Sequence, residues 1–176
     1  MTTHSELTEC IDGLCFLLDK AMKTATLLPK MEGKYSGDIV VPEKVKGNDG
    51  IDYSVIALGK CCFQECYGLT SVTIPSSVRR FGKKCFSCCS SLTTIEIPSS
   101  VISLGDFCFS GCSGFKSIEI PSSVRSLGLY CFEDCCGLTS IEIPSSVTSL
   151  GNSSFCFCIY NHRTTKTNQK YPSVNL

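Results

Sequence analysis

The stretch SIEIPSSVRSLGLYCFEDCCGL, residues 117–138, contains the pattern from which the fold can be predicted. It occurs one period earlier as TIEIPSSVISLGDFCFSGCSGF, residues 94–115. The prolines of the shared IPSS phrase recur with a fixed 23-residue period, at Pro75, Pro98, Pro121 and Pro144. A fixed period in the twenties is typical of a solenoid, in which coils stack and equivalent side chains lie above one another.

Every copy carries apolar residues at the same positions, which we call columns. Two columns of valine or isoleucine precede the proline, and a valine column follows it. Further along the copy come a column of mainly leucine, a glycine column and a phenylalanine column. The two columns before the proline are Val72, Ile95, Ile118, Ile141 and Ile74, Ile97, Ile120, Ile143. The phenylalanine column is Phe63, Phe86, Phe109, Phe132 and Phe155. We therefore expect continuous internal rows of identical side chains along the stack.

Each copy is expected to contain one short strand on its first face. The β-branched run LTSVTIP, residues 69–75, ends at a proline, which has no amide to donate to a strand ladder. Strands of successive coils should pair in parallel, with Val72 and Ile74 inward and Thr73 outward. The Val-x-x-Leu-Gly segment should form a second face, and the segment after glycine, such as residues 83–89, one helical or 3-10 turn. The predicted fold class is a β-rich solenoid with parallel strands.

The two ends of the chain depart from the 23-residue period. Residues 11–18 and 24–29 are apolar runs that predict a β-hairpin, and residues 35–45 predict a further strand. Asn48, Asp49 and Gly50 have the turn chemistry of an inserted hairpin. We therefore divide the chain into an N-terminal β cap with an irregular first coil at 1–54, a solenoid at 55–160 and a polar tail at 161–176. The tail is basic and expected to be disordered.

Charge and hydropathy restrict the partners and the compartment. Sixteen Lys+Arg balance sixteen Asp+Glu, so the chain has no net basic field for nucleic acid. No stretch approaches the roughly 18 apolar residues that a membrane span needs. The first twenty residues place Glu6, Glu9 and Asp12 ahead of an apolar run, the reverse of a secretory signal. Taken as complete, the chain would be cytoplasmic.

The phrase IPSSV-xx-LG-xx-CF-xx-C-xx-L, repeated over about residues 55–158, resembles the BspA-like class of leucine-rich repeats. That class is common in surface proteins of gut and oral bacteria and of some parasitic protists. The resemblance implies a leucine-rich-repeat solenoid, a cell-surface or extracellular location, and adhesion or recognition of a protein partner. It implies no catalysis. This chain departs from the family in lacking an export signal and in carrying cysteine, where the family often has alanine, at Cys62, Cys85, Cys108 and Cys131.

Fifteen cysteines are the unusual feature of the composition. Nine form two columns: Cys62, Cys85, Cys108, Cys131 and Cys66, Cys89, Cys112, Cys135, Cys158. A zinc site needs four converging ligands, whereas stacked columns place equivalent atoms in a line about 4.8 Å apart. We therefore expect small buried thiols and no metal. The cysteines outside the columns are expected to be the reactive or cross-linking ones: Cys10, Cys15, Cys61, Cys88, Cys136 and Cys156.

No catalytic or cofactor motif occurs in the sequence. It contains no GxGxxG, no GxxxxGK[ST] and no HExxH, and its two histidines, His4 and His162, lie near the ends of the chain. A Cys-His or Ser-His-Asp site would have to be built from those ends. We therefore expect neither enzyme activity nor a cofactor.

One set of outward residues is a candidate binding site. Two rows should project from the first face: Thr73, Glu96, Glu119, Glu142 and Ser71, Thr94, Ser117, Ser140. Repeat proteins use such faces for partners, and this acidic, hydroxyl-edged stripe suits a basic segment. A solvated face left by repeat duplication is the alternative. Two further hypotheses stay open: a structural element that self-associates through the C-terminal edge of the solenoid, and a cysteine-based metal or redox protein.

Overall fold

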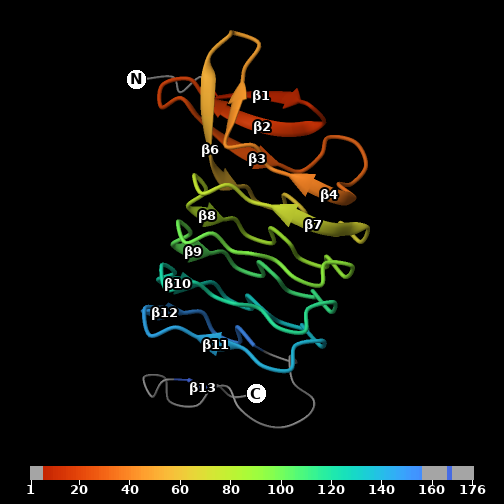
Figure 1. Cartoon of the computed structure of the whole chain (residues 1–176), viewed down its shortest axis with the longest axis vertical. Coiled ribbons are helices and arrows are strands. Elements are labelled where there is room, and N and C mark those ends of the chain that lie inside the picture. The colour runs from red at the N-terminus through yellow and green to blue at the C-terminus, as the bar shows by residue number, and fades with distance from the viewer. Residues whose placement is uncertain (1–5, 156–165, 168–176) are drawn as a thin grey trace.

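The structure, a computed structural model, describes residues 6–155 and 166–167. Its coils stack along the long axis of the molecule, with a cap of longer strands at one end (Figure 1). The described residues form strands and turns and contain no helix. Most of segment 161–176, together with His4, Cys156, Cys158 and His162, lies outside the described residues.

The cap is built from antiparallel pairs. β2 (Leu14–Asp19) pairs with β3 (Thr24–Leu28), which is the predicted hairpin, and β5 (Lys44–Lys46) pairs with β6 (Asp52–Leu58) around the predicted turn. β1 (Glu6–Ile11) adds a strand that the sequence did not predict and pairs with β2. β3 then pairs in parallel with β6, which joins the cap to the solenoid.

A parallel ladder runs down the second face of the solenoid. After β6 it contains one two-residue strand per coil: β8 (Arg80–Phe81), β9 (Ser103–Leu104), β10 (Ser126–Leu127) and β12 (Ser149–Leu150). Partners lie one period apart, as in Phe81 with Leu104 and Leu127 with Leu150. The 23-residue register therefore holds through the whole stack.

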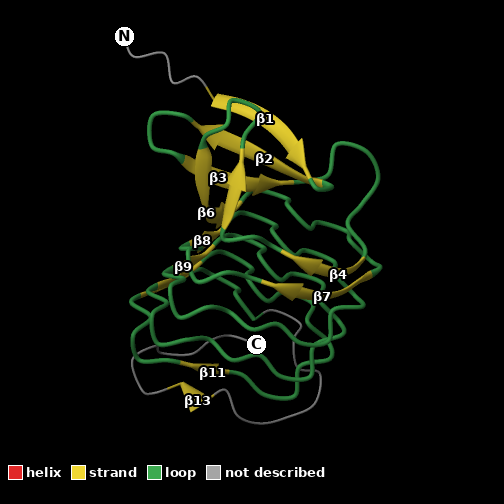
Figure 2. Cartoon of the chain, turned by 45° about the horizontal axis from the view of Figure 1, so that its top comes forward, coloured by secondary structure: helices red, strands yellow, loops and turns green. Residues whose placement is uncertain are grey.

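The first face is less regular than we expected. β7 (Leu69–Thr73) pairs in parallel with β4 (Gly37–Val40), and β11 (Glu142–Ile143) pairs with β13 (Lys166–Thr167). Between these pairs the only assigned pairing in the described residues is a bridge from Glu119 to Glu142. The alternation nevertheless persists, since Ile95 and Ile97 are buried and Glu96 between them is exposed. Figure 2 shows β4 and β7 on a different side of the coils from β8 and β9.

The segments after the glycines are linked turns, and the expected helical turn is not formed. Their amides alternate: Cys85 donates to Gly82 within its own coil, whereas Lys84 donates to Asp106 of the next coil. A helical turn would direct every amide along its own coil and leave none for the neighbour. Two residues of each such segment have a left-handed backbone, as Lys84 (φ 56°) and Cys88 (φ 62°) do in one coil.

Stacked aromatic rings fill the centre of the solenoid. The rings of the phenylalanine column are nearly parallel, with centroids 5.0 Å apart for Phe63 and Phe86 and 5.3 Å apart for Phe86 and Phe109. The same arrangement continues through Phe132 to Phe155. These rings are buried, together with the isoleucine, valine and leucine columns around them. The core is thus one row of side chains per column, as the repeat predicted.

Candidate functional site

The eight residues predicted as a binding stripe are all exposed. Their inward neighbours Val72, Ile95, Ile118 and Ile141 are buried, which fixes the outward direction of both rows. The two rows belong to the sheet face that begins with β4 and β7 and ends with β11 and β13. We call this surface the strand face.

Two adjoining hollows lie on the strand face. One, of about 710 Å³, is lined by Ser117, Glu119, Ser140 and Glu142 among others. The other, of about 550 Å³, is lined by Thr94 and Glu96 and shares Ser117 and Glu119 with the first. Both are partly open to solvent, which suits an extended segment better than an enclosed small molecule. Six of the eight predicted residues line these hollows.

The carboxylates of the strand face have no ionic partner in the described part of the chain. The ion pairs found there join Lys20 to Asp49, Lys34 to Glu65 and Lys83 to Asp106. Glu96, Glu119 and Glu142 follow one another in adjacent coils, about 4.8 Å apart along the stack. Like charges in this register repel one another. Among the described residues the row is thus an acidic stripe, with Lys166 beside Glu142 in the register of β11 and β13, and a cationic partner would relieve the repulsion between its carboxylates.

The strand face extends one coil further than the sequence predicted. In the pairing of β4 with β7, Asp38 lies beside Ser71 and Val40 beside Thr73, so both rows gain a member. The carboxylate of Asp38 accepts hydrogen bonds of 2.7 Å from Ser71 and from Thr70. The bond from Ser71, and then that from Thr70, lower the pKa of Asp38. Pro42 precedes Pro75 by more than one period, so the fixed 23-residue period does not align this coil with the others.

Serines at the coil corners hold the strand face in place. The second serine of each PSS corner donates to the carbonyl of the valine one coil earlier, as in Ser123 to Val101 at 2.7 Å. Ser77, Ser100 and Ser146 make the equivalent bond. These serines connect coils, because each corner lies directly above the preceding one.

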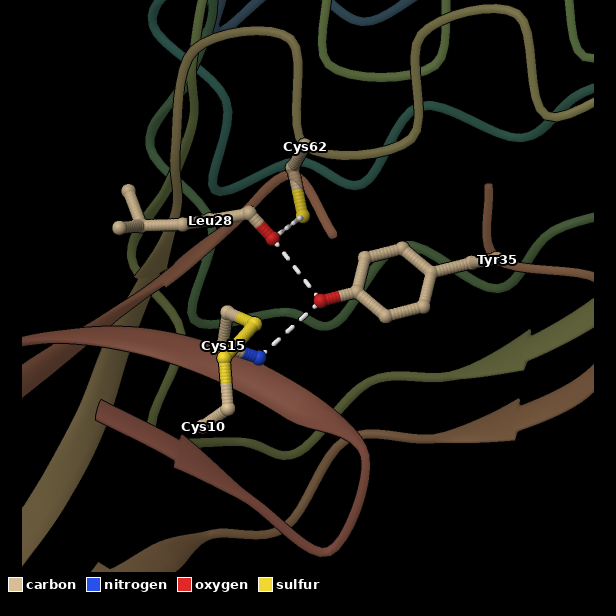
Figure 3. The surroundings of a disulfide bond; sticks show 5 residues. All are labelled: Cys10, Cys15, Leu28, Tyr35 and Cys62. Carbon is tan, nitrogen blue, oxygen red and sulfur yellow. Dashed lines mark hydrogen bonds between the residues drawn. A yellow bond between two sulfur atoms is a disulfide. The ribbon is translucent and has the colours of Figure 1, made fainter. Parts of the chain in front are cut away.

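Tyr35 connects the cap to the aromatic core, a role the sequence did not indicate. Its hydroxyl accepts a bond from the Cys15 amide and donates to the Leu28 carbonyl, both at 3.1 Å, and Cys10 is joined to Cys15 by a disulfide (Figure 3). Burial raises the pKa of Tyr35 to about 12. The cross-linking expected for the non-column cysteines is therefore present at Cys10 and Cys15.

The column cysteines of the described residues are buried and aligned along the stack. The thiols of Cys89 and Cys112 each donate to the carbonyl of a phenylalanine in the preceding coil, Phe63 and Phe86, at 3.0 Å. Burial raises the pKa of Cys112 to about 12 and that of Cys89 further. Protonated thiols are poor nucleophiles and poor metal ligands. In residues 6–155 no three His, Cys, Asp or Glu side chains gather as a metal site would require.

These features define a leucine-rich-repeat solenoid with an open strand face. The BspA type leucine rich repeat model matches residues 50–162 in six copies. The chain belongs to this family, as the sequence resemblance suggested. No curated protein matched the chain, and no helix among the described residues is long and apolar enough to cross a membrane.

Solved structures share this fold. A leucine-rich repeat protein from Bacteroides ovatus is 34% identical with a TM-score of 0.76, over 84% of this chain and 38% of that one. The leucine-rich repeat protein of T. pallidum is 25% identical with a TM-score of 0.75, over 86% of this chain and 68% of that one. A leucine-rich cell surface protein from Faecalibacterium prausnitzii is 25% identical with a TM-score of 0.60, over 88% of this chain and 53% of that one. The chain thus spans well under half of the B. ovatus protein.

Proposed function

We propose that this protein is a non-catalytic binding module that recognises a protein partner through its strand face. The observation that carries the proposal is the row of Glu96, Glu119 and Glu142, which is exposed, lines two hollows and has no ion pair in the described residues. Hydroxyl groups along the same hollows supply hydrogen bonds beside the charges. The complementary ligand is an extended basic segment of a protein.

Adhesion at a cell surface is the setting that we propose for this recognition. The similarity to a cell surface protein of F. prausnitzii supports it. The disulfide between Cys10 and Cys15 also supports it, because such bonds persist in oxidising compartments.

A labelled basic heptapeptide of sequence KTKTKTK provides a direct test of the strand face. Fluorescence anisotropy at low salt should show binding to the wild-type protein and at least tenfold weaker binding to the variant E96Q/E119Q/E142Q. The matched variant E6Q/E32Q/E43Q removes three exposed carboxylates outside the face and should bind like wild type. Equal binding by all three proteins would refute the proposal, and so would the absence of binding to the wild-type protein.

A further inference from the structure

Three outward positions of the second face carry positive charge, and the other positions are polar or apolar. In the Val-to-Leu segments of the five coils, the two positions between the buried ends include Arg79, Arg80 and Arg125 and no acidic residue. We call this surface the basic face and define it by these three arginines. They are exposed, and none forms an ion pair in the described part of the chain. Arg125 donates to the carbonyls of Ser122 and Ser123, which holds its guanidinium at the coil corner.

The strand face and the basic face lie on different sides of the same coils, because β7 and β8 belong to different sheets (Figure 2). One molecule therefore presents an acidic row on one side and a basic row on another, while its net charge is zero. A side chain of one row cannot reach the other row within the same molecule, since the buried core separates them.

The two rows also span the same number of coils, although the middle coil of the basic face carries Ile102 where its neighbours carry Arg79 and Arg125. Backbone bonds from Ile102 to Arg79 and from Arg125 to Ile102 place Arg79 and Arg125 two coils apart. Glu96 and Glu142 are likewise two coils apart, with Glu119 between them. Both separations are set by the same coil rise, about 4.8 Å per coil. When a second molecule lies alongside with its long axis parallel to the first, Glu96 and Glu142 of one molecule can therefore both lie opposite Arg79 and Arg125 of the other.

We propose that the strand face also binds the basic face of a second copy of this chain, so that molecules associate side by side. The proposal rests on the proposed function, because it assigns a partner to the same acidic row. The contact is heterologous, because the acidic row of one molecule meets the basic face of the next. A pair formed in this way leaves one strand face and one basic face unused, so further molecules can add. Exposed ion pairs are individually weak and screened by salt, so the assembly should be concentration-dependent and dissolve at high ionic strength.

Sedimentation velocity on the full chain tests the proposal. At low salt, the mass of the wild-type protein should rise with concentration above the 19.1 kDa monomer, and 0.5 M NaCl should return it to that value. The variants E96Q/E119Q/E142Q and R79Q/R80Q/R125Q should each stay monomeric, because each retains one face only. When these two variants are mixed in equal amounts, they should form a heterodimer, and the mass should not rise above that of the heterodimer. The control variant E6Q/E32Q/E43Q should associate like wild type, and circular dichroism should show that every variant is folded.

Three results would overturn the inference: a wild-type protein that is monomeric at every concentration, single-face variants that associate like wild type, or a mixture that stays monomeric. If the monomeric wild type instead bound heparin and lost it on R79Q/R80Q/R125Q, the basic face would serve an anionic polymer and the inference would fail. Peptide binding to the strand face, measured separately, would survive each of these results, so a failure here is distinct from a failure of the proposed function.

Discussion

The ring of Tyr35 packs on the ring of Phe63 at 5.2 Å between centroids and an angle of 58°, so a cap residue begins the aromatic stack of the solenoid. Replacing Tyr35 by Phe keeps this ring contact and removes the hydroxyl between Cys15 and Leu28. We expect the free energy of unfolding to fall by about 1–3 kcal/mol, since two buried hydrogen bonds are lost. Tyr35→Ala should cost about 3–5 kcal/mol. Urea denaturation measures both, and equal costs would mean that the ring contact contributes nothing.

The glycine column permits the close approach of successive coils. A Cβ at Gly105 would lie 2.7 Å from the carbonyl carbon of Gly82 and the amide nitrogen of Lys83, and backbone atoms cannot move aside cheaply. Gly105→Ala should therefore destabilise the protein by about 3 kcal/mol, at the upper end of the cost of overpacking. At Gly68 the nearest atom would be the Ser36 Cβ at 3.3 Å, so Gly68→Ala is the control and should cost much less. Thermal melts that shift equally for both variants would contradict the stacked column.

The two serines of one PSS corner should contribute differently to the free energy of unfolding. Ser123 donates to the Val101 carbonyl of the preceding coil, whereas the adjacent Ser122 is exposed. Ser123→Ala should lower the free energy of unfolding by about 1 kcal/mol, and Ser122→Ala should change it by less than about 0.5 kcal/mol. Chemical denaturation of the two variants compares neighbours of the same residue type. The reverse order would show that the corner is held in another way.

The buried thiols should make the fold sensitive to alkali. Burial raises the pKa of Cys112 to about 12 from 9.0, and burial raises the pKa of Cys85, Cys89 and Cys108 as well. Unfolded thiols lose their protons near pH 9, while the folded ones retain them. The stability that Cys112 contributes is thus fully present below pH 9 and is lost between about pH 9 and 12. This thiol should contribute a slope of about 1.4 kcal/mol per pH unit in that range, and the other three change stability in the same direction.

Urea denaturation from pH 8 to pH 11 under reducing conditions measures this slope. The variant Cys112→Ala should have a smaller slope than wild type, and Ser122→Ala should leave the slope unchanged. Stability that is constant up to pH 11 would contradict the burial of the thiols.

The 23-residue period was sufficient to predict which side chains are buried in columns and which face outward. Columns such as Phe86 and Phe109 lie where the 23-residue register placed them, and Thr73 and Glu96 face outward, because identical coils repeat one side-chain environment. The period carries no information on segments that it does not include. β1 was missed because its residues, ELTECI, do not resemble an apolar run. It is held by contacts that only the folded chain forms: its pairing with β2, the disulfide from Cys10 to Cys15 and the hydrogen bond that Glu9 accepts from the Asn48 amide.

Two other features depended on contacts between distant parts of the chain. The role of Tyr35 is set by three partners from separate segments, Leu28, Cys15 and Phe63, which local pattern cannot supply. The turns after the glycines have local spacing that fits a helical turn. Every second amide instead bonds to the next coil, and only the stacked structure shows this competition.

Photo-crosslinking can locate the surface on which the peptide binds. A photoreactive amino acid would replace Ser117 on the strand face or, in a second protein, Ser126 on the second-face ladder, at concentrations low enough to avoid self-association. With the peptide KTKTKTK, we expect a crosslink from position 117, its loss in the E96Q/E119Q/E142Q background, and little crosslinking from position 126. Crosslinks of equal yield from both positions, or from position 126 alone, would show that the strand face is not the recognition surface.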